Sequence, residues 1–160
     1  MELDDFWNLI DAAAGAGVRR DALAEQLANL SREDLIAFQA HFDRAFDAAY
    51  QWPLWGAAYL MQGGCSDDGF MDFRYGLISL GRSTYEAALI DPDSLADLAD
   101  GEFADELYGY VALDIYEDHF DDDMPRDDVP PLGDPAGSVW DFDEDTENRE
   151  RLPRLTAKYG

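Results

Sequence analysis

Hydrophobic residues recur along most of the chain at three- and four-residue intervals, the spacing that places them on one face of an α-helix. The longest such seam lies between Ser31 and Tyr50 and consists of Leu35, Phe38, Phe42, Phe46 and Ala49. Ser31 is suited to cap this helix, because its hydroxyl can accept a free backbone N–H and two acidic residues follow in the first turn. We therefore predict a helix that begins after Ser31 and forms the centre of the fold.

Two further helices are predicted on either side of Gly63-Gly64. Pro53 is tolerated at a first helical position, and the apolar, small-residue run from Leu54 to Met61 is typical of a helix buried all round. Ser66 can cap the next helix, whose apolar residues recur up to Gly81: Phe70, Phe73, Leu77 and Leu80. The pattern therefore predicts a helical hairpin that turns at the two glycines.

The remaining periodic segments predict shorter helices before and after this hairpin. They cover Leu3 to Ala14, Arg19 to Leu30, Ser83 to Leu89, Pro92 to Leu98 and Glu102 to Phe120. No alternating pattern typical of a strand is present in the sequence. We predict an all-α, single-domain helical bundle of about six to eight helices that spans residues 1–160.

The pattern fails in residues 121–136, where acidic residues cluster and prolines interrupt. The prolines are Pro125, Pro130, Pro131 and Pro135. This segment is predicted to be an acidic, Pro-containing loop. Residues 140–160 follow as a helical tail that carries Arg149, Arg151, Arg154 and Lys158, with Pro153 as a bend or a helix start. We expect this basic tail to dock onto the acidic body.

The charge balance restricts the partners of the chain. Its 36 acidic and 11 basic residues give a formal net charge of −25. Nucleic acids and anionic membranes are disfavoured as partners, because both are recognised through Lys and Arg. A basic protein or peptide is compatible with this charge, although genomic bias or solubility is the favoured explanation of the acidity.

The single cysteine and the lack of an apolar leader indicate the compartment. Cys65 has no second cysteine with which to form an internal disulfide or a multi-cysteine zinc site. No apolar run approaches the ~20 residues of a membrane span, and the N-terminal residues lack the pattern of a secretory signal. We expect a cytoplasmic protein without a cofactor.

One run is distinctive enough to indicate a family. The segment from Tyr50 to Arg82, YQWPLWGAAYLMQGGCSDDGFMDFRYGLISLGR, resembles the uncharacterised bacterial family numbered 4240 among the domains of unknown function. MELDDFWNLID, DPDSLADL and the closing LPRLTAKY are also similar to its general pattern. The resemblance implies one intact domain and a bacterial source, and it carries no established activity. The residues that match the core of the family are Trp52, Trp55, Cys65, Ser66, Asp67, Asp68, Gly69, Phe70 and Arg74.

The helix start at Gly63 to Gly69 is the one segment that looks like a site. Cys65 is a candidate nucleophile because a helix N-terminus lowers a thiol pKa, but the neighbouring carboxylates oppose this, and a small buried residue is the favoured interpretation. Asp67 and Asp68 are candidates for cation binding or acid–base catalysis. They also offset the helix dipole, and this structural role is favoured.

Arg74 and Arg82 are candidates for binding because basic residues are scarce. The favoured interpretation is a structural ion pair, with Asp114 as the distant partner, since its position on an apolar stripe would require pairing. The alternative is a polar pocket in which one of the arginines binds a ligand carboxylate. Its walls would be aromatic: Trp52, Trp55 and Tyr59.

These observations lead to three functional hypotheses. The first is a binding or regulatory module with a cleft near the Gly63–Arg74 hairpin, lined by Trp52, Trp55, Asp68 and Arg74, that accepts a small polar ligand or a basic peptide. The second is a small metal- or carboxylate-dependent hydrolase or transferase that uses Asp67, Asp68 or Cys65. The third is an acidic decoy for a basic partner. Because the sequence contains no complete catalytic or metal-ligand motif, we favour a protein that is not an enzyme.

Overall fold

The computed structural model describes residues 1–126 and 133–160, and within these ranges it is helical and free of strands. The prediction of an all-α fold is therefore confirmed. The α-helices are α1 (Leu3–Ala14), α2 (Arg19–Leu27), α3 (Arg32–Ala48), α4 (Trp52–Gln62), α5 (Asp67–Ser79), α6 (Arg82–Ile90), α7 (Val111–Phe120), α8 (Asp145–Arg151) and α9 (Pro153–Tyr159). Two 3-10 helices lie between α6 and α7, η1 (Pro92–Asp97) and η2 (Glu106–Tyr110).

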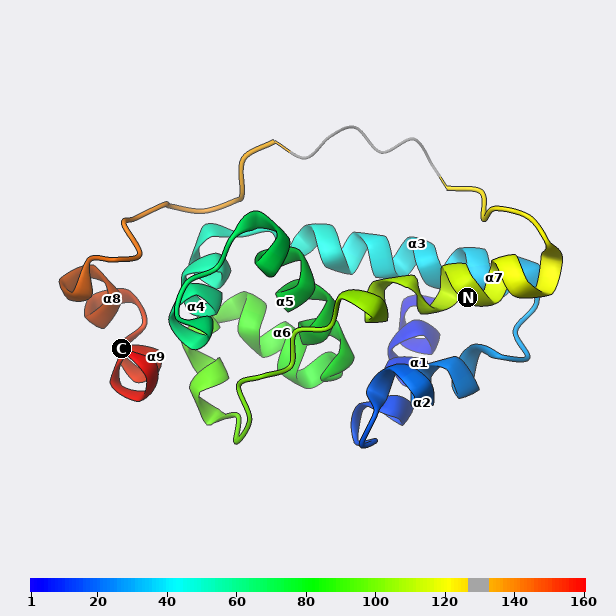
Figure 1. Cartoon of the computed structure of the whole chain (residues 1–160), viewed down its shortest axis with the longest axis horizontal. Coiled ribbons are helices and arrows are strands. Elements are labelled where there is room, and N and C mark those ends of the chain that lie inside the picture. Colours follow the sequence, from blue (N-terminus) through cyan, green and yellow to red (C-terminus); the bar gives the residue numbers. More distant parts are fainter. Residues whose placement is uncertain (127–132) are drawn as a thin grey trace.

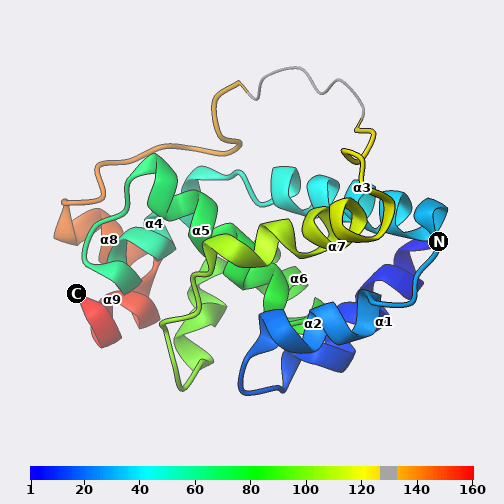
Figure 2. The same ribbon diagram turned by 45° about the vertical axis from the view of Figure 1, so that its right-hand side comes forward.

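The centre of the fold is α3, which begins after Ser31 as the sequence predicts. The Ser31 hydroxyl accepts the Asp34 N–H at 3.1 Å, and the apolar seam of the helix is buried except at Phe46, which is partly buried. Figures 1 and 2 show α1, α2 and α7 at one end of the molecule and α4, α8 and α9 at the other. The helix α5 lies between the two ends and packs against both α3 and α4.

The predicted hairpin at Gly63-Gly64 is present. Gly63 ends α4 in a left-handed conformation with φ of 68°, which favours glycine. The Ser66 hydroxyl then caps α5 by accepting the Gly69 N–H at 3.2 Å. Local sequence signals therefore account for the turn that positions the start of α5.

The single helix predicted from Glu102 to Phe120 is wrong. Residues 101–105 form no helix, and η2 and α7 follow. The cause is a close crossing, in which the Phe103 backbone passes directly over Gly76 of α5. A Cβ atom at Gly76 would lie 2.0 Å from the Phe103 carbonyl oxygen. The Asp105 N–H donates to the Asp72 carbonyl at 3.0 Å, which ties the crossing segment to α5.

The C-terminal residues pack beside α4. The Trp52 N–H donates to the Ala136 carbonyl at 2.8 Å, and the Ala136 N–H donates to the Tyr50 carbonyl at 3.0 Å. The helix α9 packs against α4 and η1, and Trp140 is buried. Residues 121–126 form no helix, while the part of the predicted acidic loop that contains Pro130 and Pro131 lies outside the described residues.

None of the helices in the described ranges combines the length and the apolar character that crossing a bilayer requires.

Candidate functional site

The predicted aromatic residues form a stack rather than the wall of a binding pocket. Trp55 lies between Trp52 and Phe70, with ring centroids 5.3 Å and 4.8 Å apart and both pairs nearly parallel. The Trp55 indole N–H donates to the Cys65 carbonyl at 2.9 Å, so this ring ties α4 to the turn before α5. Tyr59 lies further along α4, and its hydroxyl donates to Asp143 of the C-terminal segment at 2.7 Å.

Cys65 is half-buried beside this stack. Burial raises the pKa of its thiol to about 11, and the negative charges of Asp72 and Asp67 add to the rise. The thiol is therefore protonated at neutral pH, whereas a cysteine nucleophile has to be a thiolate. This geometry fits the structural role better than the catalytic one.

Arg74 is buried, with an exposed fraction of 3%. Its guanidinium carbon lies 3.8 Å from the centre of the Phe46 ring and within 5 Å of the Tyr50 and Phe70 rings. Its Nη1 donates to the Phe46 carbonyl at 3.1 Å. This carbonyl belongs to the last turn of α3, where carbonyls lack helical partners and the helix dipole favours a cation.

The other carbonyls at this helix end also have partners, so Arg74 is part of a C-terminal capping arrangement. The Tyr85 hydroxyl donates to the Ala45 carbonyl at 2.7 Å, and the Gln51 side chain donates to the Ala48 carbonyl at 2.9 Å. Burial lowers the pKa of Arg74 to about 10, which leaves it charged at neutral pH. The partners of Arg74 are therefore carbonyls and rings, in place of the carboxylate that the sequence predicts.

The predicted pairing of Arg74 or Arg82 with Asp114 is wrong. Asp114 is exposed on α7, because the buried residues of that helix include Ala112 and Tyr116 on another face. The predicted stripe assumed one continuous helix from Leu107, and the 3-10 geometry of η2 breaks this register.

Arg82, the first residue of α6, pairs instead with two other acidic residues. Its Nη1 contacts Asp4 at 2.7 Å and its Nε contacts Glu86 at 2.8 Å. Hydrogen bonds to Glu86 and Asp4 raise the pKa of Arg82. Both arginines therefore have structural partners.

Asp67 and Asp68 lie exposed in the first turn of α5, where they face the positive end of the helix dipole. Within residues 1–126 and 133–160, no group of three or more Asp, Glu, His or Cys side chains is arranged to hold a metal ion. The two aspartates differ in one respect, since Asp68 faces a hollow between α5 and η2.

This hollow, called the α5–η2 hollow below, has a volume of about 330 Å³. One wall comes from residues at helical spacing on one face of α5, and the other from η2. Its lining residues are Asp68, Met71, Asp72, Tyr75, Glu106 and Tyr110. The crossing at Gly76 sets the distance between the walls, and Gly109 allows the Tyr75 ring to lie against η2, because a Cβ there would be 2.5 Å from that ring.

Every charged residue that lines the hollow is acidic: Asp68, Asp72 and Glu106. The pKa of Asp72 is raised, first by partial burial and then by the negative charges of Glu106 and Asp68. The like charges of these carboxylates repel each other, and a bound cation would neutralise part of this negative charge.

Two tyrosine rings and a methionine complete the hollow. The Tyr75 ring is held rigidly, because it stacks on Phe46 at 4.6 Å, and the Tyr110 ring centre lies 6.3 Å away from it. Tyr110 and Met71 are 40% and 36% exposed. The hollow therefore combines carboxylates with aromatic faces and an open apolar margin.

Of the residues predicted as a site, the structure places only Asp68 in this hollow. The sequence does contain a signal for two further residues that line the hollow, Asp72 and Tyr75. Asp68 and Asp72 are like charges four residues apart on the exposed face of α5, a spacing that destabilises a helix. Tyr75 continues this face, but the contribution of η2 depends on the crossing at Gly76, which no local pattern indicates.

Comparison with known proteins identifies a family for most of the chain. The family model described as "Protein of unknown function (DUF4240)" matches residues 1–118. No curated protein and no solved structure matches the chain. The matched range contains both walls of the α5–η2 hollow, whereas α8, α9 and the closing LPRLTAKY lie beyond it.

Proposed function

This chain belongs to the DUF4240 family of proteins of unknown function, and we propose that it is a binding module that captures a cationic side chain of a basic protein or peptide in the α5–η2 hollow. The observation that carries the proposal is the arrangement of Asp68, Asp72 and Glu106 around a hollow with two tyrosine rings. Carboxylates and aromatic faces are the two groups that attract guanidinium and ammonium ions.

An organic cation fits the hollow better than a small ion does. A volume of about 330 Å³ leaves room for a side chain. A guanidinium group is planar and can donate to two carboxylates while one face lies on an aromatic ring, so arginine matches this lining more closely than lysine. Each cation–π contact contributes about 0.5–2 kcal/mol, depending on how far water is excluded.

The surroundings of the hollow favour a peptide over a free small molecule. Met71 and Tyr110 are exposed side chains that line the hollow together with the carboxylates. Such a margin can bury apolar residues that flank the cation in a peptide, whereas a free amino acid would leave it exposed. The net charge of −25 would speed the approach of a basic partner at low salt.

The proposal includes a cytoplasmic setting, for which the single free cysteine is the supporting observation. The raised pKa of Cys65 speaks against the alternative in which this residue acts as the nucleophile of a hydrolase.

The test measures binding of a fluorescein-labelled octapeptide that contains two arginines, by fluorescence anisotropy at fixed ionic strength. The same peptide with citrulline in place of arginine is the neutral control. We expect saturable binding of the arginine peptide, with Kd at least tenfold weaker for the citrulline peptide and for the variants Asp72→Asn and Glu106→Gln. Asp118→Asn removes one negative charge from an exposed position on α7 and should leave Kd unchanged.

Two results would contradict the proposal. One is an equal loss of affinity in all three variants, which would mean that the net charge of the molecule attracts the peptide. The other is equal affinity for the arginine and citrulline peptides, which would mean that the cation is not recognised.

A further inference from the structure

A second surface, within residues 1–118 that match the family, holds the basic helix α9. This helix lies outside the matched range. The surface, called the α4–η1 surface below, is formed by Gly56 of α4 and by Asp93, Ala96 and Leu98 in and after η1. It holds α9 and the residues around it. We propose that the α4–η1 surface is a docking site for a basic, proline-initiated helix of a partner protein, which displaces α9 from it.

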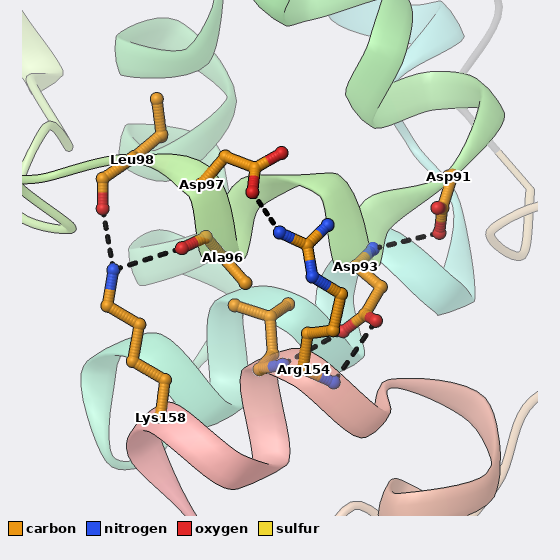
Figure 3. A network of polar contacts seen from close by, with 8 residues as sticks. Asp91, Asp93, Ala96, Asp97, Leu98, Arg154 and Lys158 are labelled. Carbon is orange, nitrogen blue, oxygen red and sulfur yellow. Dashed lines mark hydrogen bonds and ion pairs between the residues drawn. The ribbon is translucent and has the colours of Figure 1, made fainter.

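Asp93 acts as a helix cap for α9 from a different part of the chain. Its side chain is buried, and its two oxygens accept the Arg154 N–H at 3.1 Å and the Leu155 N–H at 2.9 Å (Figure 3). These are two of the N–H groups that a helix start leaves unpaired. Leu152 occupies the N-cap position and has no side-chain oxygen with which to satisfy them. The cap that α9 lacks is thus supplied by η1.

Two basic side chains of α9 contact the same element. Lys158 donates through Nζ to the Ala96 carbonyl at 3.1 Å and to the Leu98 carbonyl at 2.6 Å, and Arg154 pairs with Asp97 (Figure 3). The surface therefore recognises a helix that carries a proline at its first position, arginine at its second and lysine at its sixth.

The apolar part of the surface has room for bulky residues of the occupant. Leu155 is fully buried, and Trp140 lies against Gly56, where a Cβ atom would be 2.5 Å from the Trp140 ring. Glycine inside a helix is less favourable than alanine. Because Gly56 has no side chain, the Trp140 ring can lie directly against α4. The α4 surface can therefore accept a large side chain at this position.

Two observations indicate that the occupant can be exchanged. The surface lies within residues 1–118, which match the family, whereas α8 and α9 lie beyond them. In addition, α9 is seven residues long, and a helix of that length is not stable on its own. The contacts with the surface hold it in place, and a partner helix with the same pattern makes the same contacts. This inference does not depend on the α5–η2 hollow.

The experiment releases the resident helix by changing α9 and leaves the surface intact. The full-length variant Arg154→Glu/Lys158→Glu is mixed with a fluorescein-labelled peptide of residues 139–160 that carries the original sequence. We expect saturable binding to this variant and at least tenfold weaker binding to the wild-type chain, whose surface is occupied. Adding Asp93→Ala to the variant should abolish binding.

The variant Arg44→Glu/Arg149→Glu is the matched control. It makes the same change in charge at two exposed positions, where Arg44 of α3 contacts His41 and Arg149 pairs with Asp145 inside α8. Because α9 stays docked in it, this variant should bind the peptide no better than the wild type does. Failure of the folded Arg154→Glu/Lys158→Glu variant to bind, or binding unaffected by Asp93→Ala, would overturn the inference.

Hydrogen exchange of the wild-type chain decides the case if the variant does not fold. Release of α9 as a unit predicts that its amides exchange at least tenfold faster than those of α5, and faster still at high salt, because salt screens the Arg154 and Lys158 contacts. Equal protection of α9 and α5 would show that α9 opens only with the whole fold, which would contradict the inference.

Discussion

The crossing of Phe103 over Gly76 connects the stability of the fold to the α5–η2 hollow, and the substitution Gly76→Ala tests this connection. The added Cβ would lie 2.0 Å from the Phe103 carbonyl oxygen and 2.9 Å from Ala104 Cα. Both are backbone atoms, so no side-chain rotation can relieve the contact. The crossing segment has to move away from α5, which stretches the Asp105 N–H bond to the Asp72 carbonyl.

The expected cost follows from these contacts. Overpacking of this kind costs about 1–3 kcal/mol, the lost hydrogen bond about 1 kcal/mol more, and the better helix propensity of alanine returns about 1 kcal/mol. The net loss is about 1–3 kcal/mol in the free energy of unfolding, measured by urea denaturation. For a chain of this size the thermal midpoint should fall by about 2–4 °C for each kcal/mol.

Gly69→Ala is the matched control in the same helix. A Cβ at Gly69 would be 3.4 Å from the Ser66 hydroxyl and 3.5 Å from the Cys65 sulfur, which are ordinary contacts. This variant should be as stable as the wild type or more stable by up to about 1 kcal/mol. Gly76→Ala should also weaken binding of the arginine peptide, because it shifts the wall that carries Glu106. A Gly76→Ala variant as stable as Gly69→Ala would refute the reasoning.

Three further predictions concern the residues with shifted pKa values. Cys65, whose thiol pKa rises from 9.0 to about 11, should react with iodoacetamide on the order of 100-fold more slowly in the folded chain than in the urea-unfolded chain at the same pH. Arg74→Met should lower the free energy of unfolding in urea by about 2–4 kcal/mol, because the Phe46 carbonyl loses its donor and the cation leaves the rings, and Arg74→Lys should recover part of this loss. Asp72→Asn should be more stable than the wild type at neutral pH. The raised pKa means that the folded state binds the Asp72 proton more tightly than the unfolded state does, so the contribution of Asp72 to stability falls as the pH rises from its ordinary pKa of 3.8 through the raised value. The stability advantage of the variant, measured in urea, should shrink as the pH is lowered towards 3.8, and an advantage that is constant with pH would contradict the shift.

The sequence predicted those helices whose signals are local. Ser31 and Ser66 cap α3 and α5, the helices that follow them. Gly63 ends α4 in the left-handed conformation that favours glycine. The prediction of one helix from Glu102 to Phe120 fails because the course of this segment depends on its contact with Gly76. That contact joins residues far apart in the chain, and periodicity within one segment carries no information about it.

The candidate site was harder to predict for the same reason. Charged residues at Asp68 and Asp72 can be placed on one face of α5 from their spacing, but Glu106 reaches them only because η2 is held against α5. The sequence favours a structural role for Arg74, as one partner of an ion pair. Its partners could not be predicted, because carbonyl groups at the end of a helix occur in every sequence and leave no mark in residue identity.

The most direct test of the cation-binding proposal is an NMR titration of the ¹⁵N-labelled full-length chain with Nα-acetyl-arginine methylamide, with the citrulline analogue as control. The proposal predicts chemical-shift changes that saturate and are concentrated in residues 68–75 and 106–110, with much smaller changes for the citrulline compound. Changes centred elsewhere in the molecule, or equal changes for both compounds, would contradict the assignment of the α5–η2 hollow as a cation-binding site.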